Sequence, residues 1–193
     1  MHKGGKRGVS REWKVEIESA LAKEDAKALL GLARDQTGRA VRYLTGQLCS
    51  ASEEEKWRAV RALGVVAGDG HLVSLEKATD LMRWFLWALN DESGGVPYGV
   101  PEAMGEILAV RPELQRDFLP ILCSMVTDVD MLQTGPIERG VLWALGRVGA
   151  PVARCSPEAI EALRAASATH TDPETRRVAA WSLASLASAH AAP

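Results

Sequence analysis

Apolar residues recur along this chain at helical spacing, and short runs of Pro, Gly, Ser and Asp interrupt them. The alternating β-branched runs that form strands are nearly absent. Ser52, Ser156 and Asp172 are suitable helix N-caps. Proline falls where a first helical turn would begin, a position that tolerates it, at Pro101, Pro136, Pro157 and Pro173. We therefore predict an all-α protein of about ten helices joined by short loops.

The predicted helices repeat with a period near forty residues. Four of them contain the segments that begin at Trp57, Pro101, Arg139 and Arg177. The third position of these segments holds Ala59, Ala103, Val141 and Ala179. The seventh position holds Leu63, Ile107, Leu145 and Leu183. The tenth position holds Val66, Val110, Val148 and Leu186. These offsets mark one apolar helix face per unit. A preceding helix is expected over about 39–50, 72–90, 114–127 and 157–168, with an earlier pair over about 10–22 and 24–35.

Three runs in this register resemble HEAT-like repeats, which are related to armadillo repeats: 58–64 (RAVRALG), 139–146 (RGVLWALG) and 177–184 (RVAAWSLA). The resemblance implies a right-handed α-α superhelix of five hairpins over residues 10–190. It also implies a concave surface lined by the second helices, and binding to other proteins. Residues 1–9 are basic and rich in glycine, and we expect them to be a flexible tail. The segment from Leu89 to Ile107 further resembles a signature of prokaryotic HEAT-like proteins that have no assigned activity.

Composition narrows the functional classes. The formal net charge of −2 gives no global attraction to nucleic acid or to anionic membranes. No apolar run is long enough to cross a bilayer, so we expect a soluble, cytoplasmic chain. The three cysteines, Cys49, Cys123 and Cys155, have no CxxC spacing. We expect free thiols packed as small apolar side chains. We expect no cofactor and no metal, and the sequence leaves the oligomeric state open.

The most unusual segment runs from Trp87 to Ile107. The sixth position of the aligned helices holds Ala62, Glu106, Ala144 and Ser182, so Glu106 places a carboxylate where the repeat prefers a small residue. A buried carboxylate needs a cation or hydrogen-bond donors. Glu102, one turn earlier, shares its helix face. Either the two carboxylates converge on a cation, with Arg139 as one candidate, or the helix is rotated and water solvates both.

Asp91 and Glu92 follow the helix expected over 72–90, at the end where negative charge is unfavourable. Donors in the next helix, a basic side chain or a ligand could stabilise them. The alternative is an ordinary turn. A metal site is not favoured, because the cluster lacks histidine and EF-hand spacing.

Tryptophan accounts for six residues of the chain. Trp143 and Trp181 occupy the same repeat position, four residues after Arg139 and Arg177. This spacing stacks guanidinium on indole, and Trp and Arg are typical interface anchors. The alternative is that Trp fills space between helices while Arg shields its edge. The apolar surroundings of Trp84 and Trp87 predict that both are buried.

These patterns favour a protein-interaction scaffold with a concave Trp/Arg surface and a central acidic loop. The candidate binding residues are Asp91, Glu92, Glu102, Glu106, Arg139, Trp143, Arg177 and Trp181. A ligand-binding or enzymatic pocket at the acidic cluster is the alternative. It includes a role like that of DNA-alkylation glycosylases, in which Trp87 and Asp91 would act with Arg139 and Trp143. The slightly acidic charge argues against nucleic acid.

Overall fold

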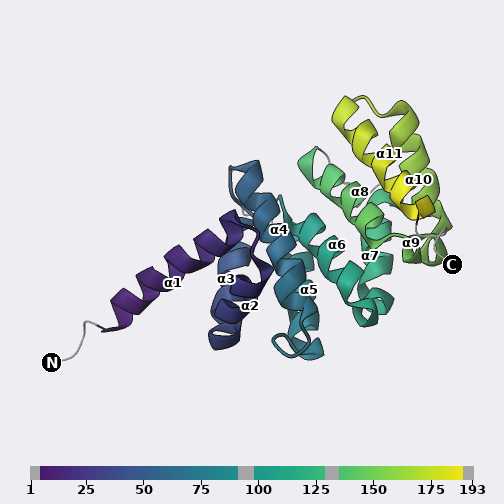
Figure 1. The fold of residues 1–193 in the computed structure, drawn as a ribbon. Helices are drawn as coiled ribbons and strands as arrows, with labels where there is room; N and C mark the ends of the chain where they lie inside the picture. Colours follow the sequence, from purple (N-terminus) through teal and green to yellow (C-terminus); the bar gives the residue numbers. More distant parts are fainter. Residues whose placement is uncertain (1–4, 91–97, 129–134, 189–193) are drawn as a thin grey trace. The chain divides into compact units, whose positions relative to one another are not determined.

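The computed structural model describes residues 5–90, 98–128 and 135–188, and these residues form helices and no strand (Figure 1). The elements in chain order are α1 (Gly5–Ala22), α2 (Ala26–Asp35), α3 (Thr37–Gln47), α4 (Glu53–Gly68), α5 (Leu75–Leu89), α6 (Val100–Val110), the 3-10 turn η1 (Pro112–Leu114), α7 (Gln115–Thr127), α8 (Pro136–Val148), α9 (Pro151–Cys155), α10 (Pro157–Thr169) and α11 (Pro173–Ser188). The all-α prediction is confirmed, and all ten expected helices are present.

The helices differ from the prediction at one boundary and by one additional helix. Helix α1 begins at Gly5, so it takes in part of the segment expected to be a tail over residues 1–9. Its first turn simply continues the helix that buries Trp13 and Ile17. The sequence also gave no indication of α9, because five residues are too few for a periodic pattern.

The helix contacts separate into two compact units, residues 1–78 and 79–193. The first unit contains α1 to α4, and each of these helices packs on its neighbour in sequence. Its core includes Ile17, Leu44, Leu48 and Leu63, which are fully buried. The expectation of a single domain over 10–190 stays a prediction.

The turn between α1 and α2 contacts α4, the last helix of the first unit. Glu24 adopts a positive φ of 51°, a conformation that glycine usually supplies after a helix. Its backbone amide donates to the Leu21 carbonyl, and the next amide, of Asp25, donates to Ala20. The Glu24 carboxylate then pairs with Arg61 on α4. A side chain at this position therefore joins the turn to the last helix of the unit.

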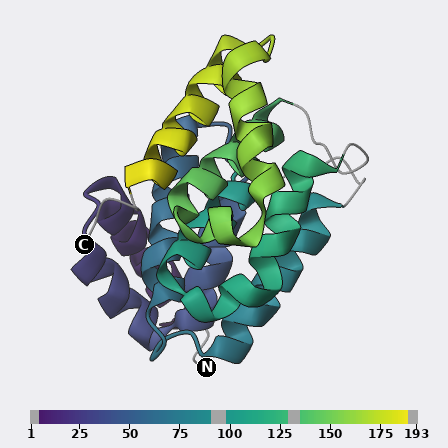
Figure 2. The same ribbon diagram turned by 90° about the vertical axis from the view of Figure 1, so that its right-hand side faces the viewer.

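The second unit contains two layers of helices. α8 packs between α6 and α11, and these three are second helices of consecutive repeats. The first helices α7 and α10 contact each other, and α10 also runs beside α11 (Figure 2). The helices of one repeat therefore pack mainly on those of the next, as the sequence period predicts.

Small residues set the distance between the second helices. A Cβ on Gly105 of α6 would lie 2.6 Å from both Cα and Cβ of Ala144 on α8. A Cβ on Gly146 of α8 would lie 2.6 Å from Oγ of Ser182 on α11. The Ser182 hydroxyl hydrogen-bonds to the Leu142 carbonyl at 2.7 Å. The helix backbones therefore approach more closely than ordinary side chains would allow.

The repeat register holds at most of the predicted core positions. All four residues at the third position are fully buried, but Val110 at the tenth position is 41% exposed, so that prediction is wrong. The reason is that α6 ends at Val110, and Leu108 takes the buried place instead.

The predicted burial of Trp84 and Trp87 is also wrong. Their exposed fractions are 42% and 62%. The buried face of α5 carries Ala78, Met82 and Phe85 at helical spacing, which leaves both tryptophans on the opposite side. Because apolar residues occur on all sides of this helix, the sequence pattern does not show which face is buried.

Replacing Gly105 with alanine should destabilise the second unit. The added methyl group would overlap backbone atoms of Ala144, which cannot move aside as a flexible side chain can, so we expect a loss of about 1–3 kcal/mol in the free energy of unfolding. Urea denaturation followed by circular dichroism measures it.

Gly31→Ala is the matched control, because Gly31 lies inside α2 and its Cβ would meet nothing within 4 Å. That variant should be neutral or more stable by up to about 1 kcal/mol, through helix propensity. Equal stability of Gly105→Ala and the native chain would show that the helices are not in close contact there.

Candidate functional site

The candidate site lies on α6, α8 and α11, all in the second unit. Glu106 occupies the small-residue position of α6, and only 11% of its side chain is exposed. Its Oε1 lies 3.0 Å from Nε of Arg147, in the last turn of α8. A cation at that end of a helix is favoured by the helix dipole. The buried carboxylate is thus neutralised by an arginine of the next repeat.

Glu102 is buried as well, with 3% of the residue exposed. Its carboxylate lies over Gly140 of α8: a Cβ there would come within 2.6 Å of Oε2. Glycine at position 140 therefore makes the space that Glu102 fills. Both carboxylates face α8, so the prediction of a rotated helix with two solvated glutamates is wrong.

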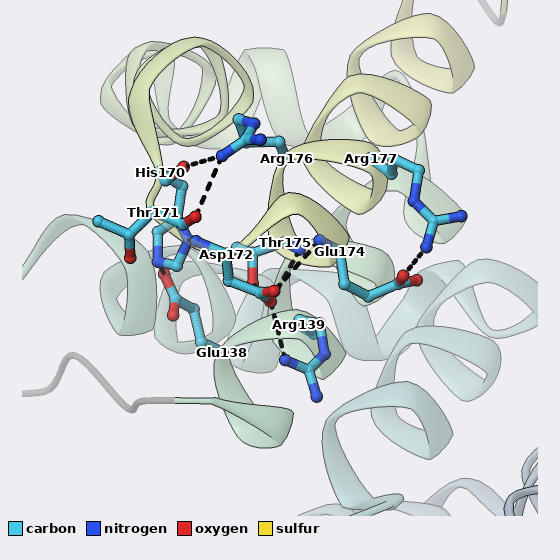
Figure 3. Close-up of polar contacts among 9 residues, drawn as sticks. All are labelled: Glu138, Arg139, His170, Thr171, Asp172, Glu174, Thr175, Arg176 and Arg177. Atoms are coloured by element: carbon cyan, nitrogen blue, oxygen red, sulfur yellow. Dashed lines mark hydrogen bonds and ion pairs between the residues drawn. The ribbon is translucent and has the colours of Figure 1, made fainter.

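Arg139 does not take the role expected of it beside Glu106. Its Nη1 lies 3.0 Å from Oδ2 of Asp172, in the turn before α11 (Figure 3). The sequence identified Asp172 only as an N-cap. Arg147 lies forty-one positions from Glu106, and no repeat or motif pattern connects the two residues.

Asp172 organises the start of α11. Its Oδ2 accepts hydrogen bonds from the hydroxyl of Thr175 at 2.7 Å and from the Thr175 amide at 3.1 Å. The hydroxyl bond, the amide bond and Arg139 together hold the pKa of the Asp172 carboxyl below its usual value. One carboxylate therefore caps α11 and also joins it to α8.

A histidine contact lies beside this cap. His170 Nδ1 accepts a hydrogen bond from the Asp172 amide at 3.0 Å, while its Nε2 lies 3.3 Å from Oε1 of Glu138 on α8. A neutral imidazole with the proton on Nε2 satisfies both contacts. Arg176 donates to the carbonyls of His170 and Thr171 (Figure 3). His170 is the C-cap residue of α10, and no local sequence pattern connects it with Glu138.

Two tryptophans at equivalent repeat positions, Trp143 and Trp181, meet between α8 and α11. The rings of Trp143 and Trp181 stack with centroids 5.8 Å apart and planes 8° from parallel. Trp181 remains 43% exposed. Arg139 forms an ion pair with Asp172, and Arg177 forms one with Glu174. Stacking of each arginine on its own tryptophan stays a prediction.

Two predicted residues, Asp91 and Glu92, lie outside the described residues. Among those described, no group of three or more His, Cys, Asp or Glu side chains could hold a metal ion. No helix in the same part of the chain has the length and apolarity of a membrane span.

Comparisons with known proteins bear on the fold. No protein-family model matches the chain, and no curated protein does. A designed armadillo repeat protein is similar in structure, with a TM-score of 0.51, 20% identity and coverage of 83% of this chain and 68% of the other. A second designed armadillo repeat protein, solved in complex with the peptide (KR)4, has a TM-score of 0.52, 18% identity and coverage of 83% and 69%.

This chain has an armadillo/HEAT-like helical-repeat fold. Within that fold, Glu106 and Asp172 are the carboxylates that join consecutive repeats, α6 to α8 and α8 to α11.

Removing Arg147 should cost more stability than removing Glu106. Arg147→Ala leaves a mostly buried carboxylate without its cation, and we expect a loss of about 2–4 kcal/mol. Glu106→Ala restores the small residue of the repeat and leaves an arginine that water can reach, so the loss should stay under about 1 kcal/mol. Urea denaturation of both variants and of the double variant measures the order.

The double variant should recover most of the stability lost in Arg147→Ala. If both single variants lost the same free energy of unfolding, the loss in Arg147→Ala would not arise from leaving the buried Glu106 carboxylate without a cation.

The cap at Asp172 should make the second unit sensitive to acid. Because folding lowers the pKa of this carboxyl, its contribution to stability is complete above the unfolded value near 4 and is lost as the pH falls through the folded value. Thermal unfolding between pH 7 and pH 2 should therefore show a smaller decrease for Asp172→Asn than for the native chain.

Asp117→Asn is the matched control, since Asp117 is an exposed carboxylate in the first turn of α7. If Asp117→Asn and Asp172→Asn changed the acid dependence equally, the special role of Asp172 would be excluded.

Proposed function

We propose that this chain is a protein-interaction scaffold that binds a peptide segment of a partner along one face of α8 and α11. The face consists of Arg139, Trp143, Arg147, Arg177 and Trp181, and we call it the Trp/Arg face. Arginine and tryptophan alternate at four-residue spacing on each helix, which places them on one side.

The stacked pair Trp143 and Trp181 carries the proposal. A core tryptophan would be shielded from water, yet Trp181 is 43% exposed. Tryptophan and arginine are the side chains that contribute most to binding energy at protein interfaces. An indole held parallel to a second indole loses little freedom when a partner covers it, so the cost of ordering on binding is small.

The arginines of the Trp/Arg face are also held in place before binding. Asp172 holds Arg139, Glu106 holds Arg147, and Glu174 holds Arg177. Each pair brings opposite charges together, so the face has no strong excess of either sign. Apolar and aromatic side chains of a partner, with hydrogen bonds at the rim, fit it better than a highly charged segment.

The fold similarity supports this function in a general way. One structural neighbour, a designed armadillo repeat protein, is in complex with a peptide. For this chain, a basic group of a partner would approach the predicted acidic loop at Asp91 and Glu92.

No observation favours the enzymatic alternative. Glu106 is neutralised by Arg147, and Glu102 fills the space over Gly140. In the glycosylase-like set Arg139 would contact a ligand, whereas among the described residues it forms an ion pair with Asp172. The carboxylates on α6 thus serve the packing of repeats.

A random peptide library displayed on phage, selected against the full chain, tests the proposal. Selected peptides should lose at least about tenfold in affinity for Trp181→Ala, because truncating an interface tryptophan typically costs more than 1 kcal/mol. Fluorescence anisotropy with labelled synthetic peptides measures the dissociation constants.

Trp87→Ala is the matched control, as it removes an exposed tryptophan from another helix. It should leave the affinity unchanged, and circular dichroism should show both variants folded. Enrichment of no peptide, or equal affinity for the native chain and Trp181→Ala, would refute binding at the Trp/Arg face.

A further inference from the structure

Two of the three cysteines lie on helices that pack together. Cys123 is on α7 and is 2% exposed, and Cys155 is the last residue of α9 and is exposed. α9 contacts α7 (Figure 1). Val152, three residues before Cys155, is fully buried, so Cys155 follows it on the same side of the helix, although Cys155 itself is exposed. The expectation that all the cysteines are packed is therefore wrong for Cys155, and also for the exposed Cys49.

The two thiols are direct neighbours. Burial, together with the charge and hydrogen bond of the Cys155 side chain, raises the pKa of the Cys123 thiol to about 12. A hydrogen bond between two thiols requires side-chain contact. One sulfur of this pair is thus shielded from solvent while the other is open to it, with both in one compact unit.

We propose that Cys123 and Cys155 are a modification site, at which a small disulfide such as oxidised glutathione converts the thiol pair into an intramolecular disulfide. The exposed thiol of Cys155 reacts first with the small disulfide, and the buried thiol of Cys123 then reacts with the resulting mixed disulfide. The inference concerns α7 and α9, and it is independent of the proposed binding at the Trp/Arg face.

The reaction has two exchanges. The Cys155 thiolate attacks one sulfur of oxidised glutathione, forming a mixed disulfide and releasing one glutathione thiolate. The Cys123 sulfur then attacks Sγ of Cys155, its proton passes to the departing second glutathione thiolate, and the Cys123–Cys155 bond forms. Two protein thiols are oxidised and one glutathione disulfide is reduced to two glutathione thiols, so atoms and electrons balance.

The product closes a chain loop that contains all of α8. Cross-linking such a loop restricts the unfolded chain and so stabilises the folded unit. Because α8 carries Trp143 and Arg147, oxidation would stabilise the helix on which the packing of the second unit depends. Cys49 lies in the first unit, and the two cysteines of the second unit suffice for the bond.

The test uses the full chain with Cys49→Ser, which leaves only the proposed pair. After incubation with oxidised glutathione, intact-mass spectrometry should show the loss of two hydrogen atoms from a monomer that no longer reacts with iodoacetamide. The melting temperature should rise by about 10 °C, and dithiothreitol should reverse both changes.

The control is Cys49→Ser/Cys155→Ser, which keeps the buried thiol alone. Since Cys155 is exposed, this variant should fold, and circular dichroism checks it. It should show neither the mass change nor the rise in melting temperature. A stable glutathione adduct on Cys155 with Cys123 still free, or a disulfide-linked dimer, would overturn the proposal.

Discussion

The close approach of α6, α8 and α11 is the constraint on which the rest of the second unit depends. Where Gly105 meets Ala144 and Gly146 meets Ser182, the helix backbones are too near for larger side chains. At that separation, polar groups of one repeat reach those of the next. Arg147 contacts Glu106, and Arg139 contacts Asp172, between these closely packed repeats.

The fold was largely predictable, because each helix satisfies several local requirements at once. Pro136, Pro157 and Pro173 begin helices as their position suggested, and Ser156 caps α10 through its hydroxyl. A repeat period adds independent evidence, since the same face must be apolar in each unit. The prediction was wrong where the sequence pattern does not distinguish the buried face of a helix from the exposed one. On α5, apolar residues occur on all sides, and Trp84 and Trp87 face solvent.

The candidate site was predictable only in part. The repeat register identified Glu106 at a small-residue position, with burial and exposure both left open, and it placed Trp143 and Trp181 at the same repeat position; the structure shows Glu106 buried and the two indoles stacked. It did not show which cation meets Glu106, because ion-pair partners depend on the rotation of each helix and on the reach of each side chain. Asp172 is an example. Its role as a helix cap can be predicted from the neighbouring residues, whereas its ion pair with Arg139 can be identified only once the helices are packed.

The contact between Glu102 and Gly140 affects how the repeats of this chain can evolve. A Cβ at position 140 would meet only the far end of the Glu102 side chain, so a larger residue there fits if that side chain moves, whereas removal of the Glu102 carboxylate leaves the space over Gly140 unfilled. The two positions are therefore coupled, because a change at one alters what fits at the other. When a repeat of this chain is duplicated or exchanged, the fit at this contact depends on both repeats.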